Sequence, residues 1–185
     1  FPIAISAASI PLFTYLTLEP ALNPLILGVT AYVFLQMLFQ IGVSGELKEV
    51  EAASERNLLR ALGTRVTGNR ITVGAWTTLL VAGLKGPHVL IGLWVAWSYG
   101  ALLEAAYIGM GVFMLALLMV DIGHWDRGRA LRQMALIEIF SYYLIVVALW
   151  RFTGFYETVF LLGAPTLWFF VWNRVLWGSV VAPRV

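Results

Sequence analysis

Apolar and polar residues follow one another along this chain in long blocks. Six apolar blocks are separated by short polar or proline-containing stretches, and they cover roughly residues 3–18, 24–43, 71–84, 88–120, 133–150 and 156–176. A membrane-spanning helix needs about 20 mostly apolar residues. The pattern therefore predicts an all-α integral membrane protein, a bundle of about six transmembrane helices.

Two of these blocks fit a membrane span poorly, because 71–84 is short and 88–120 is long. The stretch GLKGPH at residues 83–88 separates them, and Pro87 there is typical of a break, where a missing backbone N–H does the least damage. The stretch AWSYGA at 96–101 is a second candidate break. It would divide the long block into an interfacial piece and a true span.

The composition agrees with a membrane protein. Hydrophobic residues make up 61% of the 185 residues and charged residues 12%, about half the charged share of a soluble domain. The absence of cysteine excludes disulfides and thiolate metal sites, and a net charge of +2 is too small to indicate nucleic-acid binding. The chain opens on Phe1 and an apolar run without a basic region, so we expect a cut end rather than a signal peptide.

The basic residues predict the orientation, since Lys and Arg accumulate on the cytoplasmic side of membrane proteins. If the chain enters from the cytoplasm and crosses six times, only Lys85 and Arg151 lie outside. The loops 44–70 and 121–132 are then cytoplasmic. The residues expected inside are Lys48, Arg56, Arg60, Arg65, Arg70, Arg127, Arg129, Arg132, Arg174 and Arg184.

The polar block GELKEVEAASERNLLRALG, residues 45–63, is the long polar stretch of the chain. No proline separates it from the apolar block 24–43, so we expect that helix to continue and residues 45–60 to form a helical cap. Glu46 and Glu49 then share one face, one turn above the membrane surface. Carboxylates of this kind, with arginines behind them, suit Mg²⁺ bound to a diphosphate. A solvated cap of mixed charge explains the same composition without a ligand.

This block resembles the second acidic motif of the UbiA superfamily of intramembrane polyprenyl transferases, which commonly reads D-x-x-D-x-E-x-D before a Gly-ended stretch. Glu46 stands at the first Asp, Glu49 at the second and Glu51 at the Glu, and LLRALGTR at 58–65 stands at the Gly-ended stretch. The stretches FPIAISAASIPLF and DRGRALRQMALIEIFSYYLIVVAL also resemble helices of the second half of these enzymes, so the likeness covers roughly residues 1–150.

The resemblance implies a Mg²⁺-dependent prenyltransferase, of which residues 1–155 are the second half. Its partners would be an isoprenyl diphosphate and an aromatic, chlorin or other lipophilic acceptor, within the membrane lipids. Glu46 and Glu49 would hold the metal and act in catalysis, while Glu51, Arg56 and Arg60 would bind the substrate. Residues 156–185 extend beyond the family pattern as an additional C-terminal transmembrane helix and tail.

The sequence also departs from the family. Ala53 stands where the last Asp of the motif belongs, the other acids are Glu, and the first acidic motif of these enzymes does not occur in this chain. These departures favour a second hypothesis: a prenyltransferase-like bundle that has lost its chemistry. It would serve as a structural subunit beside other membrane subunits, with or without bound pigment.

Other ionisable residues lie inside apolar blocks. Glu104 is expected near the middle of the membrane, either as a functional carboxylate or as a neutral side chain hydrogen-bonded to Tyr107 or Ser98. Glu138 is expected either to form a hydrogen bond between helices or to line the substrate cavity. The two histidines, His88 and His124, are expected on opposite sides of the membrane. A shared metal site is therefore not expected, although axial ligation of a heme or chlorin by one of them stays open.

Overall fold

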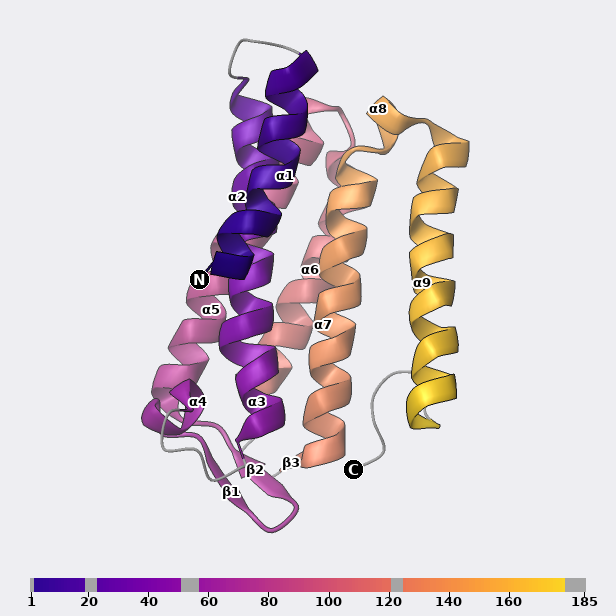
Figure 1. Cartoon of the computed structure of the whole chain (residues 1–185). Coiled ribbons are helices and arrows are strands. Elements are labelled where there is room, and N and C mark those ends of the chain that lie inside the picture. The colour runs from indigo at the N-terminus through magenta and orange to yellow at the C-terminus, as the bar shows by residue number, and fades with distance from the viewer. Residues whose placement is uncertain (1, 19–22, 51–56, 121–124, 179–185) are drawn as a thin grey trace.

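The computed structural model describes residues 2–18, 23–50, 57–120 and 125–178 (Figure 1). Helices dominate this part of the chain, and a small antiparallel sheet lies at one end of the bundle. The elements in chain order are α1 (Pro2–Leu18), α2 (Pro24–Phe39), the π-helix η1 (Gln40–Gly45), α3 (Glu46–Glu49), α4 (Leu58–Ala61), β1 (Arg65–Thr67), β2 (Arg70–Thr72), α5 (Ala75–Ser98), α6 (Leu102–Val120), β3 (Trp125–Asp126), α7 (Arg127–Ala148), α8 (Trp150–Thr153) and α9 (Phe155–Trp177).

Four helical segments in the described part of the chain are long and apolar enough to cross a membrane. They are Pro24–Gly45, Ala75–Ser98, Gly128–Ala148 and Phe155–Leu176. Two shorter helical segments, Ala4–Thr17 and Leu102–Ala116, are apolar as well. The all-α class is confirmed, and these helices indicate a membrane protein. The count of six crossings stays a prediction.

The expected break at residues 83–88 is wrong. α5 is one helix of 24 residues that passes through Lys85 and Pro87. Pro is tolerated inside membrane helices because neighbouring groups satisfy the backbone that it disturbs. The turn lies at the second candidate break instead. There Ala101 N donates to Ala96 O at 2.8 Å and Gly100 N donates to Trp97 O at 3.0 Å, which is a Schellman ending with Gly100 in the left-handed region at φ 72°.

α2, α5, α6 and α7 form the body of the bundle, and α1 packs against α2 at one edge (Figure 1). α9 lies at the other edge, beside α7. The contact between α9 and α7 includes two tyrosines: Tyr142 Oη donates to Leu161 O at 2.6 Å, and Tyr143 Oη lies 2.7 Å from Thr166 Oγ1. Much of the apolar surface of α9 is exposed, as suits a helix that faces lipid.

Two glycines allow the central helices to approach closely. A Cβ on Gly28 of α2 would overlap the ring of Trp94, and a Cβ on Gly92 of α5 would lie 2.8 Å from Leu144 of α7. Small residues at such contacts are the usual means of packing helices in membranes. The close contact of α2, α5 and α7 therefore depends on glycine.

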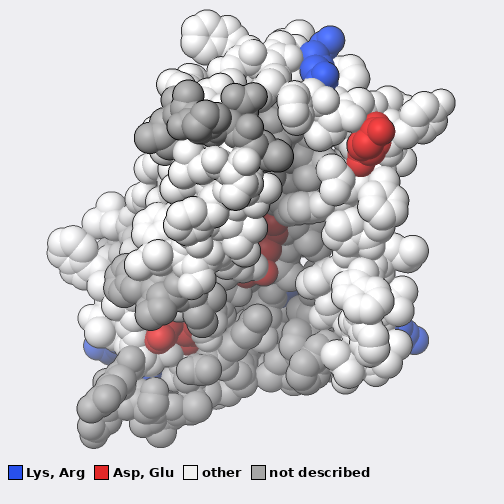
Figure 2. Space-filling model, turned by 45° about the horizontal axis from the view of Figure 1, so that its top comes forward, with Lys and Arg blue, Asp and Glu red and all other residues white. Residues whose placement is uncertain are grey.

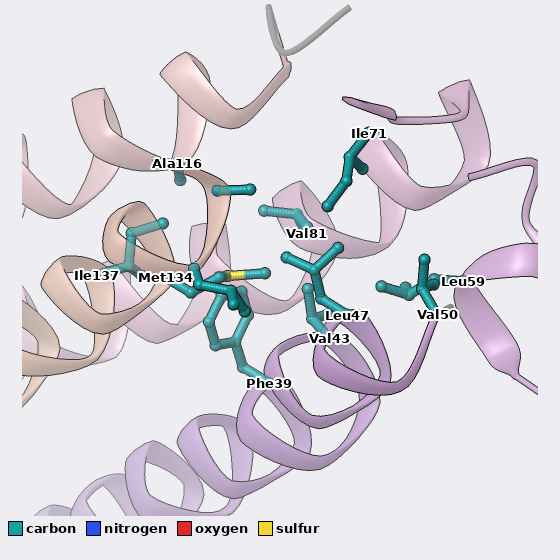
Figure 3. Close-up of a cluster of buried hydrophobic side chains, with 12 residues drawn as sticks. Phe39, Val43, Leu47, Val50, Leu59, Ile71, Val81, Ala116, Met134 and Ile137 are labelled. Carbon is teal, nitrogen blue, oxygen red and sulfur yellow. The ribbon is translucent and has the colours of Figure 1, made fainter. Parts of the chain in front are cut away.

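An apolar cluster joins the bundle to the polar block beyond it (Figure 3). Side chains from α2, η1 and α3 meet side chains of α5, α6 and α7, while Leu59 of α4 and Ile71 of β2 enter the cluster from the cap. The buried members are Phe39, Val43, Leu47, Val50, Leu59, Ile71, Val81, Ala116, Ala130, Leu131, Met134 and Ile137. The cap is therefore packed on the bundle and is not a free loop.

The cap differs from the single helix expected over residues 45–60 and from the helical loop expected over 44–70. The chain does continue from α2 through η1 into α3, as predicted. However, Asn57 is extended at φ −80° and ψ 121°, so α4 is a separate helix. After α4 the chain forms a β-hairpin, in which Arg65 pairs with Thr72 and Thr67 pairs with Arg70. Gly68, at φ 59°, takes the first position of its two-residue turn.

Candidate functional site

Glu46, the first residue expected to hold a metal, is built into the cap. It begins α3 and is half-buried. Its Oε2 accepts a hydrogen bond from the Leu58 backbone N–H at 2.7 Å, and its carbonyl oxygen accepts one from Asn57 Nδ2, also at 2.7 Å. The side chain of Asn57 in turn caps α4 by accepting from Arg60 N at 3.1 Å. One carboxylate oxygen of Glu46 therefore supports the start of α4.

The other expected site residues are described less fully. Glu49 ends α3, so the backbone places it one turn after Glu46 as predicted, but its side chain lies outside the described part. Glu51 and Arg56 also lie outside the described residues, as does Ala53. Among the residues that the structure does describe, no group of three or more His, Asp or Glu side chains is placed to hold a metal ion.

Arg60 lines an open cleft in the cap. The cleft has a volume of about 680 Å³, and a second guanidinium, that of Arg65, lies on it. The hydroxyl-bearing residues Thr64 and Thr67 and the turn glycine Gly68 complete the polar part of the wall. Arginine binds phosphate through two parallel N–H donors, so two arginines on one cleft suit a phosphorylated ligand. Arg65 was not expected in the site, because the hairpin that carries it was not predicted.

The core beneath the cap holds a much smaller space. An enclosed cavity between η1, α4 and α5 measures about 10 Å³, roughly the room that one water molecule needs. Thr64 and Thr77 face each other in this region, with their hydroxyl oxygens 2.9 Å apart. A ligand of the cap would therefore occupy the open cleft and not the interior.

A second polar centre lies inside the bundle, around Lys85. This side chain is only 2% exposed, although the sequence pattern placed it in an outside loop. Its Nζ donates to Gln36 Oε1 at 2.6 Å and to Ser141 Oγ at 2.9 Å, and it lies 4.1 Å from the centre of the Phe39 ring. The prediction for Lys85 is wrong because its hydrogen-bond partners are on α2 and α7, far away in the sequence.

Glu138 and His88 belong to the same centre. Glu138 lies on α7 one turn before Ser141, is half-buried, and interacts electrostatically with Lys85. His88 is fully buried one turn after Lys85, and its ring centre lies 3.7 Å from that of Tyr32. Within the described part of the chain, neither ring nitrogen has a hydrogen-bond partner. Figure 2 shows acidic side chains at the bottom of a hollow in a mostly uncharged face.

Glu104 stands in the first turn of α6, and its carboxylate forms an ion pair with Arg151 at 3.3 Å in place of the expected bond to Tyr107 or Ser98. Both side chains are about half exposed, so the pair fastens the end of the bundle weakly. His124 lies outside the described residues.

Comparison of the chain with protein-family models, with curated proteins and with solved structures gave no match.

Proposed function

We propose that this chain is the second half of an intramembrane prenyltransferase and that its cap binds the diphosphate of an isoprenyl donor. The observation that carries the proposal is the cap cleft, where Arg60 and Arg65 line an open space at the end of an apolar helical bundle. A ligand with an anionic head and a long apolar tail suits this arrangement. The resemblance of residues 45–63 to the second acidic motif of the UbiA superfamily supports the same substrate class.

In this proposal the cap binds and orients the head group, while the bundle keeps the tail in lipid. Arg60 and Arg65 hold diphosphate oxygens by charge-assisted hydrogen bonds. The donor set fits Mg²⁺ in kind, because Glu46 uses one carboxylate oxygen for Leu58 and has a second, and Glu49 follows one turn later. Bound Mg²⁺ would neutralise charge on the leaving diphosphate. The orientation with the cap in the cytoplasm is part of this proposal.

A structural subunit is the second candidate, and one contact favours it. The carboxylate of Glu46 already accepts the Leu58 N–H at 2.7 Å, so this residue has a role in holding the cap together without any metal. Together with Ala53 at the last motif position, this contact suits a prenyltransferase-like bundle that retains the fold and has lost the reaction. Binding partners would then be other membrane subunits.

The deciding experiment measures diphosphate binding and prenyl transfer by the full-length protein in nanodiscs. The donor is a radiolabelled isoprenyl diphosphate, titrated with and without Mg²⁺. Arg60→Ala and Arg65→Ala should each weaken binding by roughly tenfold, since a hydrogen bond to a charged group contributes about 1.5 kcal/mol or more. Arg70→Ala is the matched control, because Arg70 is an exposed arginine of the same hairpin that does not line the cleft.

The outcomes separate the two candidates. Mg²⁺-dependent binding that is lost in the cleft variants but kept in Arg70→Ala supports the transferase, and Glu46→Gln should then abolish transfer. Protein that is folded but shows neither Mg²⁺-dependent diphosphate binding nor turnover would exclude the enzyme and leave the structural subunit. Equal losses in all three arginine variants would show that general positive charge, and not the cleft, attracts the ligand.

A further inference from the structure

Two helices, α5 and α7, bring ionisable side chains to one level inside the bundle. Lys85 lies ten residues after the start of α5 and thirteen before its end, which at 1.5 Å per residue is about 15 Å and about 20 Å. Glu138 stands midway along α7. Both lie in helices long and apolar enough to cross a membrane. Ionisable groups at this depth are expensive and usually functional.

Lys85 is held as a cation would be. Its Nζ has two oxygen acceptors, Gln36 Oε1 at 2.6 Å and Ser141 Oγ at 2.9 Å, and lies over the Phe39 ring. The Ser141 hydroxyl donates its own hydrogen bond to Ile137 O at 2.6 Å, so the lone pairs of Ser141 Oγ are free to accept from the ammonium. The half-buried Glu138 lies on α7 one turn before Ser141, the second hydrogen-bond acceptor of Lys85. An ammonium with these partners avoids most of the penalty for burying a charge.

His88 does not fit a purely structural centre. It is fully buried, and neither ring nitrogen has a hydrogen-bond partner among the residues that the structure describes, although leaving a buried polar group unsatisfied destabilises the folded protein. A leucine at this position would avoid that cost. A neutral imidazole always carries one acceptor nitrogen and one N–H donor, so His88 offers a vacant proton acceptor one turn from the Lys85 ammonium.

The surroundings of Lys85 contain few other groups that titrate. α2 faces it with Gln36 and Phe39 and carries Tyr32 against His88. α7 faces it with Glu138 and Ser141. The titratable residues of the described part of α6 are Glu104 and Tyr107, and both are exposed near the start of that helix. The centre is therefore a small set: one amine, one carboxyl group, one imidazole and one phenol.

We propose that Lys85, Glu138 and His88 form an intramembrane proton-exchange site. Glu138, the half-buried member, takes up a proton from outside the centre, and the proton is shared among its carboxylate, the Lys85 amine and the His88 ring. With Lys85 protonated and Glu138 ionised the centre is neutral, and uptake of one proton gives it one positive charge. The ligand is the proton itself. The inference is independent of the prenyltransferase proposal, because it uses none of the cap residues.

Infrared difference spectra between acid and alkaline pH test the site in full-length protein in nanodiscs. A protonated carboxyl group has its own C=O stretching band, so wild-type protein should show a carboxyl band that grows as the pH falls. Glu138→Gln should lose this component, whereas the matched control Glu104→Gln should keep it. Lys85→Met should enlarge the band at neutral pH, because the carboxylate then loses its cationic neighbour. A band unchanged by Glu138→Gln would overturn the proposal.

A second measurement needs no change at the site. The ¹⁵N-imidazole signals of His88 are recorded in histidine-labelled wild-type protein and are assigned as the signals that a His88→Gln variant lacks. His88 signals that respond to pH over the same range as the Glu138 carboxyl band support proton exchange. Signals of a single neutral tautomer, unmoved over the whole range in folded protein, would show that the centre is structural and would also overturn the proposal.

Discussion

The Lys85 ammonium meets the Gln36 side-chain oxygen at 2.6 Å in the middle of the bundle, although 49 residues separate them in the sequence. Its second hydrogen bond, to Ser141 Oγ, reaches another 56 residues along the chain. One side chain of α5 thus connects α2 and α7. Because these contacts replace solvent for a buried ion, they bear directly on the stability of the bundle.

Replacing Gln36 with leucine should destabilise the protein. The change leaves the buried ammonium one acceptor short, and a hydrogen bond to a charged group contributes about 1.5–3 kcal/mol. We expect a loss of unfolding free energy in that range, measured by denaturant titration in detergent. Gln36→Leu combined with Lys85→Met should cost less than the sum of the single changes, because the pair acts together. Strict additivity would show that the contact contributes nothing.

The glycine contacts between the central helices give a second prediction. Gly92→Ala places a Cβ within 2.8 Å of Leu144 and 3.0 Å of Tyr32, so we expect a loss of about 1–3 kcal/mol from overpacking. Gly83→Ala, on the same helix, has nothing within 4 Å of the new Cβ. It should be neutral or slightly stabilising, since alanine is the better helix former. Thermal unfolding of the two variants in parallel checks this, and equal effects would contradict the close packing.

Lys85 also shows what the sequence could and could not predict. The long apolar blocks predict helices well: the last block, expected over 156–176, is α9 at Phe155–Trp177. A lysine, a proline and two glycines within the six residues 83–88 are typical of a turn, and only the partners on α2 and α7 explain why α5 continues through them. Local pattern cannot reveal partners that lie 49 and 56 residues away. The polar centre was therefore missed, while the true turn at Gly100 was visible as a candidate break.

The cap was predicted in part for a related reason. Continuity from α2 into α3 followed from the absence of proline, and it is confirmed. The separate start of α4 depends on Asn57 and on the Glu46 carboxylate twelve residues before Leu58, a contact that charge patterning does not show. The hairpin did have a local signal, the Gly68–Asn69 pair between alternating residues, but its three-residue strands are too short to stand out beside membrane helices.

Glu46 should tolerate glutamine better than alanine. Glutamine keeps an oxygen that can accept the Leu58 N–H, so Glu46→Gln should cost less than about 1 kcal/mol. Glu46→Ala removes the acceptor at the start of α4, and losing a cap of this kind costs about 0.5–2 kcal/mol. Unfolding of both variants in detergent measures the difference. If glutamine is as harmful as alanine, the carboxylate charge and not the hydrogen bond to Leu58 stabilises the cap.

The orientation of the bundle gives the last prediction. The chain has no cysteine, so single cysteines introduced at chosen positions can be labelled without background by a membrane-impermeant maleimide in oriented vesicles. Asn69 in the cap hairpin and Gly128 at the start of α7 lie at the same end of the structure, since β2 pairs with β3 immediately before α7. Asn69→Cys and Gly128→Cys should therefore label from the same side, and Ser54→Cys with them.

Tyr156→Cys, exposed at the start of α9, should label from the opposite side, because α7 separates it from Gly128 by one crossing. The positive-inside rule predicts that the first group is cytoplasmic. Labelling of Tyr156→Cys from the same side as Asn69→Cys would show that α7 does not cross the membrane. Labelling of Asn69→Cys and Gly128→Cys from the outside would reverse the proposed orientation.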